Sequence, residues 1–261
     1  MINFSIGFIG GGRAVRIILG GFKRGGKLPR RIIVSDINIE GLKTLRNEFP
    51  EIIIAEKDNG KAASQDIIFI ALHPLVIGDA LGEVKAYIKP SSIVISLAPK
   101  ITISTMSEVL DGHHKIVRMI PNAPSIINEG YNPVAFSPSL TEMERSSLID
   151  IFNILGDTIQ IPEEKLEAYA ILFAMGPTYL WFQLDTLHEV GRSFGLSEQE
   201  LNDGLKKMTT GTVNTMYNSG MSPQDVMDLV AVKPLKEYEE EIKNMYRKSL
   251  DAMYKKLKDK V

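Results

Sequence analysis

A glycine cluster near the start of the chain has the spacing needed to bind a phosphate-containing ligand. The apolar residues 6–9 lead into Gly10, Gly11 and Gly12, and a helix-like segment begins at once with Arg13. Gly10 can make a tight turn, Gly12 has no Cβ to obstruct a phosphate, and the first amides of the next helix can face the anion. This strand–turn–helix pattern is typical of a dinucleotide pyrophosphate site, and an ordinary glycine-rich turn is the alternative.

An acidic residue ends the second predicted strand. Residues 31–35 are mostly apolar and lead into Asp36. The next two residues are Ile37 and Asn38, so no Arg or Lys directly follows the carboxylate. A carboxylate at this point can accept hydrogen bonds from the adenosine ribose hydroxyls and repels a 2′-phosphate. We therefore expect NAD or NADP as the cofactor, with a preference for NAD.

Further candidate residues follow the ends of other predicted strands, where the loops of a parallel sheet build ligand sites. Arg13 can pair with the pyrophosphate or point to solvent, and His73 can hydrogen-bond the cofactor or substrate or simply begin a helix. Asn122 can fix an amide or a ribose. Besides Gly10, Gly12 and Asp36, we assign these residues to the cofactor: Arg13, Ala14, Leu72, His73, Pro74, Ala98 and Asn122.

A proton donor is harder to identify. Hydride transfer needs a nicotinamide ring held flat against a small electrophile in a site that excludes water. Lys100 and Lys233 are possible acids or carboxylate binders, although a lysine is commonly a solvated surface group. His113 and His114 have no further ligands that we can assign, so we predict no metal site.

The elements that must position these residues change in type along the chain. In residues 1–162, short runs rich in Val, Ile and Phe alternate with amphipathic segments, a pattern typical of βαβ units with right-handed crossovers. This predicts an α/β Rossmann-type, doubly wound, mostly parallel sheet as the dinucleotide-binding domain. The predicted strands are residues 5–10, 32–35, 52–55, 67–72, 93–96, 116–119, 134–137 and 158–161.

From residue 163 to 261 we find no strand pattern, so we predict an all-helical dimerisation and substrate domain. Within it, residues 178–194 are apolar around most of a helix circumference, which requires burial on several sides. A homodimer or a higher oligomer is expected to provide that burial, and a core helix within the monomer is the alternative. The predicted helices are residues 163–174, 178–194, 197–218, 222–230 and 235–258.

Composition narrows the class of protein. With 261 residues, 44% hydrophobic and 24% charged, the chain suits a globular protein of two domains. A net charge of −2 gives no electrostatic case for nucleic acid or membrane partners. The absence of cysteine excludes thiolate chemistry, and we see neither a signal peptide nor a membrane span, so we expect a cytoplasmic protein.

Residues 118–130 resemble a signature of the pyrroline-5-carboxylate reductase family. They contain Arg118, then Pro-Asn-Ala-Pro at 121–124, then Gly130, close to the family pattern of Arg, Met-Pro-Asn-Thr-Pro and Gly. Residues 7–12, 71–74, 93–98 and 175–178 resemble other family segments in the same order. The resemblance implies a nicotinamide-dependent reductase that acts on a C=N bond in proline biosynthesis, forms an intertwined dimer, and places Asn59 near the adenosine.

The second half departs from the family pattern. The family segment Ser-Gly-Ser-Gly-Pro, which lies in its substrate pocket, corresponds to residues 173–177 here, and both hydroxyl residues are absent. The Ser-Pro-Gly-Gly-Thr-Thr segment corresponds at best to residues 231–236. We therefore expect a larger or more apolar substrate, with Asn122, Met175, Gly176, Thr178 and Tyr179 as its binding residues. Thr178 and Lys233 are candidates for a catalytic role that remains unknown.

These observations favour an NAD(P)-dependent reductase that transfers a hydride to the C=N or C=O carbon of a small anionic substrate. The alternative is a catalytically silent dinucleotide-binding paralogue, which the loss of the hydroxyl residues favours.

Overall fold

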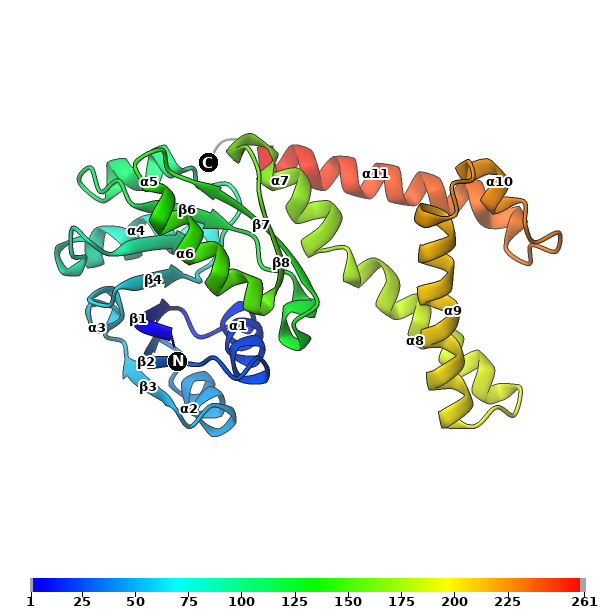
Figure 1. Cartoon of the computed structure of the whole chain (residues 1–261), viewed down its shortest axis with the longest axis horizontal. Coiled ribbons are helices and arrows are strands. Elements are labelled where there is room, and N and C mark those ends of the chain that lie inside the picture. The colour runs from blue at the N-terminus through cyan, green and yellow to red at the C-terminus, as the bar shows by residue number, and fades with distance from the viewer. Residues whose placement is uncertain (1, 259–261) are drawn as a thin grey trace. The chain divides into compact units, whose positions relative to one another are not determined.

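The apolar runs of the first half form one eight-stranded sheet with helices on both faces (Figure 1). The computed structural model describes residues 2–258 and the side chains of residues 4–258. Most strands consist of buried Ile, Val and Phe, as expected when both faces of a sheet are covered. The strands are β1 (Ile2–Ile9), β2 (Pro29–Asp36), β3 (Ile52–Glu56), β4 (Ile67–Ile70), β5 (Ile93–Ser96), β6 (Ile116–Met119), β7 (Gly130–Phe136) and β8 (Gly156–Gln160).

The strand order is β3-β2-β1-β4-β5-β6-β7-β8. All neighbouring strands pair in parallel except β6 and β7, which are antiparallel. The order reverses beside β1, because β2 and β4 lie on its two sides, and a crevice for a ligand forms at such a switch point. The prediction of a doubly wound, mostly parallel sheet is confirmed.

Helices cover the sheet through two apolar layers. One layer packs α1, α2 and α6 on the sheet through residues such as Val15, Leu42 and Leu148. The other packs α3, α4 and α5 through Ala62, Leu81 and Met106. These helices are α1 (Arg13–Arg24), α2 (Ile39–Glu48), α3 (Asn59–Ala63), α4 (Pro74–Val84), α5 (Ile103–Val109) and α6 (Glu142–Phe152), with short turns η1 (Lys85–Tyr87), η2 (Ala123–Ile127) and η3 (Asn153–Leu155).

The remaining elements are helical, and residues 163–258 contain no strand, as predicted. The helical segment after β8 changes its winding along its length, because η4 is a narrow 3-10 helix and η5 is a wider π-helix. The elements are η4 (Glu163–Lys165), α7 (Leu166–Tyr169), η5 (Ala170–Ala174), α8 (Pro177–Ser193), α9 (Glu198–Asn218), α10 (Pro223–Met227), η6 (Lys236–Tyr238) and α11 (Glu239–Lys258).

The chain divides into two compact units at a later point than residue 162. The first contains the residues up to Met175 together with the end of α11 from Met253, and the second is Gly176–Ala252. Residues 163–174 join the sheet unit because Leu166, Ala170 and Ile171 are buried there. The end of α11 belongs with them, since the Lys258 ammonium donates to the Glu164 carbonyl at 2.7 Å.

The second unit has almost no interior of its own. Among residues 176–252, only Gly191 and Leu201 are buried. Large apolar side chains of α8 are half exposed or more, including Leu180, Trp181 and Phe182. Within residues 2–258, the structure contains no helix with the length and apolarity needed to span a membrane.

Candidate functional site

The turn after β1 has the backbone geometry that a phosphate-binding turn requires. Gly10 has φ +99°, and a Cβ at this position would collide with the carbonyl oxygen of Ala71. Its amide donates to the Ser35 carbonyl at 2.7 Å, which fixes the turn against the end of β2. Only glycine fits this position, because it tolerates positive φ and has no side chain.

Gly12 opens onto free space at the start of α1. No atom lies within 4 Å of the position that its Cβ would occupy. Gly12 is the N-cap of α1 and provides no side-chain cap for the first amides. The side chain of Arg13 is exposed, and among the described residues its guanidinium has no hydrogen-bond or ion-pair partner. Uncapped amides, a helix N-terminus and an adjacent guanidinium fit a pyrophosphate.

Asp36 ends β2 and holds the glycine turn from the side. Its carboxylate accepts a hydrogen bond from the Gly11 amide at 2.7 Å and another from the Asn38 amide at 2.8 Å. These contacts keep the half-buried carboxylate beside the turn, and each oxygen keeps a further lone pair. The arrangement leaves room for the predicted hydrogen bonds to a ribose diol, and the role of Asp36 at a cofactor stays a prediction.

Asn59 and His73 both have partners within the protein. The Asn59 amide accepts a hydrogen bond from Ser35 at 2.8 Å and donates to Glu83 at 3.3 Å. His73 is the N-cap of α4, where its Nδ1 accepts from the Leu75 amide at 3.4 Å, and Pro74 occupies the first turn. The geometry therefore shows a helix-capping role for His73, and roles for both residues at a cofactor stay predictions.

Ala98 and Asn122 follow β5 and β6 at the same edge of the sheet. Ala98 is buried, and its amide donates to Ser96 Oγ at 3.3 Å. Asn122 is also buried. Its backbone amide donates to Asn132 Oδ1 at 3.0 Å, and its side-chain amide donates to the Phe173 carbonyl at 2.6 Å. Asn122 thus connects the β6 loop to the helical segment that follows β8.

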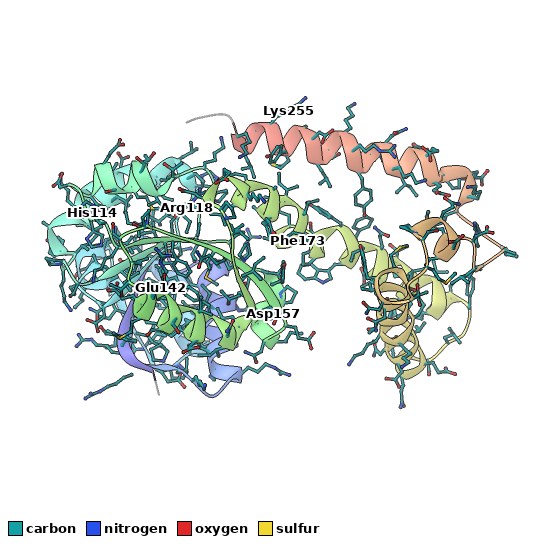
Figure 2. All side chains as sticks on the ribbon, turned by 45° about the horizontal axis from the view of Figure 1, so that its top comes forward. His114, Arg118, Glu142, Asp157, Phe173 and Lys255 are labelled. Atoms are coloured by element: carbon teal, nitrogen blue, oxygen red, sulfur yellow. The ribbon has the colours of Figure 1, made fainter. Side chains whose placement is uncertain are left out.

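The structure reveals a buried ion cluster that sequence reasoning did not identify. We call it the Arg118 cluster; it consists of Arg118 on β6, Glu163 in η4 and Glu167 in α7. The guanidinium donates to Glu163 at 3.0 Å and to Glu167 at 2.7 Å. Figure 2 shows Arg118 inside the sheet unit and Phe173 on the helical segment that continues from the cluster. Arg118 belongs to the family-like stretch, but nothing in the sequence indicated its partners.

Charge pairing controls the ionisation of Glu167. Burial by itself raises the pKa of Glu167, but the hydrogen bond and charge of Arg118, together with backbone hydrogen bonds that include the Lys100 amide, lower it more. The pKa therefore lies below its ordinary value of 4.5. Glu167 is therefore ionised at neutral pH, and its charge pairs with the buried guanidinium of Arg118.

The predicted substrate residues fall in both units. Asn122 and Met175 belong to the first unit, whereas Gly176, Thr178 and Tyr179 begin α8 in the second. Lys233 is also in the second unit, where its ammonium pairs with Asp228 at 3.3 Å. Their roles at a substrate stay predictions.

An aromatic cluster adjoins Asn122 in the first unit. The rings of Tyr131, Tyr169 and Phe173 lie in contact, with the Tyr131–Phe173 centroids 5.4 Å apart and the Tyr169–Phe173 centroids 5.0 Å apart. Tyr131 is 38% exposed and Phe173 is 40% exposed. Because β7 runs antiparallel to β6, its first residues lie at the edge where Asn122 follows β6.

A family model matches the first part of the chain. Residues 5–100 match the family described as NADP oxidoreductase, coenzyme F420-dependent. This range contains the glycine turn, Asp36 and Ala98.

Individual proteins match most of the chain. Pyrroline-5-carboxylate reductase of Escherichia coli is 26% identical over 226 residues, which cover 86% of this chain and 84% of that protein. The enzyme of the same name from Methanosarcina acetivorans is 25% identical over 88% of this chain and 85% of that protein. The crystal structure of Plasmodium falciparum pyrroline carboxylate reductase with NADP bound is similar in fold, with a TM-score of 0.82, 22% identity and coverage of 99% of this chain and 98% of that chain.

Proposed function

We propose that the chain is a divergent member of the pyrroline-5-carboxylate reductase family and that it is an NAD(P)-dependent reductase. It transfers a hydride to the C=N or C=O carbon of a small anionic substrate. The observation that carries this proposal is the glycine turn, where the open space at Gly12 meets the uncapped start of α1 beside Asp36. The location of the protein in the cytoplasm stays a prediction.

The residues of this chain divide the work of binding between the two sides of β1. The turn from Gly10 to Ala14 holds the pyrophosphate, with Arg13 available to pair with it, and Asp36 holds the adenosine ribose. The loops after β4, β5 and β6 then lie along the nicotinamide half, since these strands follow β1 on its other side. The bound cofactor supplies the hydride.

We expect the protein to orient the substrate and to exclude water from the site, and not to supply a strong general acid. A protonated imine is electrophilic enough to accept a hydride without a strong general acid. Asn122 is placed to fix an amide or a substrate group, and Thr178 and Lys233 remain candidates to bind a carboxylate or to move a proton.

The aromatic cluster supports a substrate that is larger or more apolar than pyrroline-5-carboxylate. Phe173 stands where the family has a serine, and its ring packs against Tyr131 and Tyr169. Each hydrogen bond to a charged group is worth about 1.5–3 kcal/mol. The loss of two donors to the substrate carboxylate should therefore reduce kcat/KM for pyrroline-5-carboxylate by about two orders of magnitude or more.

A second copy of the chain is the partner that we propose for the helical unit. The exposed apolar side chains of α8 and the near absence of a buried core in residues 176–252 support this. A symmetric contact between two such units would bury these side chains on both copies.

Steady-state kinetics test this function. Purified protein is assayed for oxidation of NADH and NADPH with a panel of cyclic imines and 2-oxo acids that includes pyrroline-5-carboxylate. We expect substrate-dependent oxidation with at least one compound and a kcat/KM for pyrroline-5-carboxylate below about 10⁴ M⁻¹s⁻¹. A higher value would show that pyrroline-5-carboxylate, the substrate of the family, is also a good substrate of this protein. Cofactor binding without turnover of any compound would instead favour the silent paralogue.

A further inference from the structure

Two carboxylates hold the loop that connects β5 to α5. The Lys100 amide donates to Glu167 Oε1 at 3.3 Å, and the Ile103 amide donates to Glu163 Oε1 at 2.8 Å. Lys100 has φ +80°, a conformation that residues other than glycine adopt only when their surroundings hold it. The loop from Leu97 to Thr102 is therefore held in its middle, at Lys100, and just after its end, at Ile103 where α5 begins, by side chains that come from beyond β8.

The same two carboxylates share one buried guanidinium. The side chain of Arg118 is 1% exposed and that of Glu167 is 8% exposed. A charge at this depth is stable only when it is paired and hydrogen-bonded. Arg118 therefore fixes the positions of Glu163 and Glu167, and each carboxylate in turn fixes one loop amide.

The helical segment of residues 163–174 reaches a second loop at its other end. The Phe173 carbonyl accepts a hydrogen bond from the Asn122 side chain at 2.6 Å. This segment thus binds the loop after β5 through Glu163 and Glu167, and the loop after β6 through Phe173. Both loops lie at the carboxyl edge of the sheet, on the opposite side of β1 from Asp36.

We propose that Glu167 is a positioning residue which, together with Arg118, sets the loop from Leu97 to Thr102 against the nicotinamide half of the cofactor. The inference rests on the proposed function, because it assumes that a dinucleotide binds along this edge. Glu167 does not touch the cofactor, and it acts through the Lys100 amide. Its loss therefore weakens the hold on the nicotinamide and leaves the adenosine half bound.

Calorimetry with two ligands separates these halves. The ligands are the tighter of NADH and NADPH, and the matching ADP-ribose without nicotinamide, carrying a 2′-phosphate in the case of NADPH. Glu167→Gln keeps the size of the side chain but removes its charge. We expect this variant to bind the complete cofactor about tenfold more weakly and to bind the ADP-ribose within about twofold of wild type. Glu167→Asp, which keeps the charge, restores part of the affinity.

Two further measurements separate positioning from a general loss of structure. Glu164→Gln is the matched control, because Glu164 lies in η4, three residues before Glu167, and its exposed side chain makes no hydrogen bond within the described residues. It should bind both ligands like wild type. Hydrogen exchange should accelerate at the amides of residues 98–103 in Glu167→Gln and remain unchanged in Glu164→Gln.

The outcomes distinguish the two proposals. Equal effects on both ligands in Glu167→Gln and Glu167→Asp, or no effect on either ligand, would overturn the positioning role of Glu167. Failure of the wild-type protein to bind NADH, NADPH and both forms of ADP-ribose would instead overturn the proposed function, and with it the ligand that Glu167 positions.

Discussion

Gly12 is the residue at which we expect the absence of a side chain to matter most for ligand binding. Its φ of −80° and ψ of −162° are open to any residue, and nothing in the folded protein occupies the space of a Cβ. Neither the backbone conformation nor the core therefore requires glycine at this position. A phosphate approaching the start of α1 does require it, because a side chain would take its place.

Gly12→Asp should therefore abolish binding of NADH and NADPH while the protein remains folded. Aspartate is a good N-cap residue and would bond the free amides of α1, so thermal stability should be unchanged or slightly higher. The new carboxylate would exclude the pyrophosphate by charge and by volume. Calorimetry and a thermal melt measure the two effects. Gly82→Asp adds the same group at an open position in α4 and should bind like wild type. Unchanged binding by Gly12→Asp would place the cofactor elsewhere.

Asp36 should determine the preference between NAD and NADP. Asp36→Asn removes the charge that repels a 2′-phosphate, so the affinity for NADPH relative to NADH should rise about tenfold. Asp58→Asn is a matched control, because Asp58 is an exposed carboxylate that caps α3 and asparagine can cap it as well. Dissociation constants for both cofactors test this. If wild-type protein binds NADPH tenfold tighter than NADH, Asp36 does not face the ribose as we expect.

At the scale of elements, the sequence indicates helix ends more fully than it indicates contacts between side chains that are far apart in the chain. The capping boxes of Thr141 with Glu144 and of Ser197 with Glu200 are local features of the sequence, because both partners lie within one turn. The short helices α3 and α5 were not predicted, since so few residues show no clear period. The Arg118 cluster could not be predicted, because its hydrogen-bonded partners are 45 and 49 residues away and only the folded sheet brings them together.

The contribution of residues 163–174 to the stability of the fold should depend on pH. Burial raises the pKa of Glu167, but Arg118 and the backbone hydrogen bonds to this carboxylate together lower it more, so the folded-state pKa is below the ordinary 4.5. A group with a depressed pKa stabilises the fold above its unfolded pKa, and this contribution disappears as the pH falls through the folded value. Glu167→Gln should therefore be less stable than wild type at about pH 7, and the difference should shrink below pH 4.5.

Urea unfolding of both proteins across this pH range measures the difference. At neutral pH, loss of one partner from a buried ion pair costs about 3–5 kcal/mol. A difference in stability that stays constant from pH 7 down to pH 3 would show that the charge of Glu167 does not stabilise the fold.

For the whole molecule, the sheet and its connections followed from the sequence more completely than the assembly did. The apolar runs and the glycine turn predicted the mostly parallel sheet, because buried parallel strands have a distinctive composition. The division into units depends on packing over long distances, and residues 163–174 belong to the sheet unit through contacts that no local pattern indicates.

The exposed apolar surface of the helical unit should be covered by a second copy of the chain. Trp181 is 53% exposed and Phe182 is 63% exposed, and few side chains in their unit are buried. Light scattering at micromolar concentration should give at least the mass of a dimer. Trp181→Lys should weaken that assembly, whereas Glu189→Lys, at an exposed polar position of α8, should leave it intact. A monomer at micromolar concentration would contradict this expectation.

A crystal structure with NADH or NADPH bound tests most directly whether the carboxyl edge of the sheet is the cofactor site. We expect the pyrophosphate against the turn from Gly10 to Ala14, the adenosine ribose at Asp36, and the nicotinamide beside the loop after β5 and Asn122. A dinucleotide bound away from the start of α1, or with its nicotinamide on the Asp36 side of β1, would contradict the site that we propose.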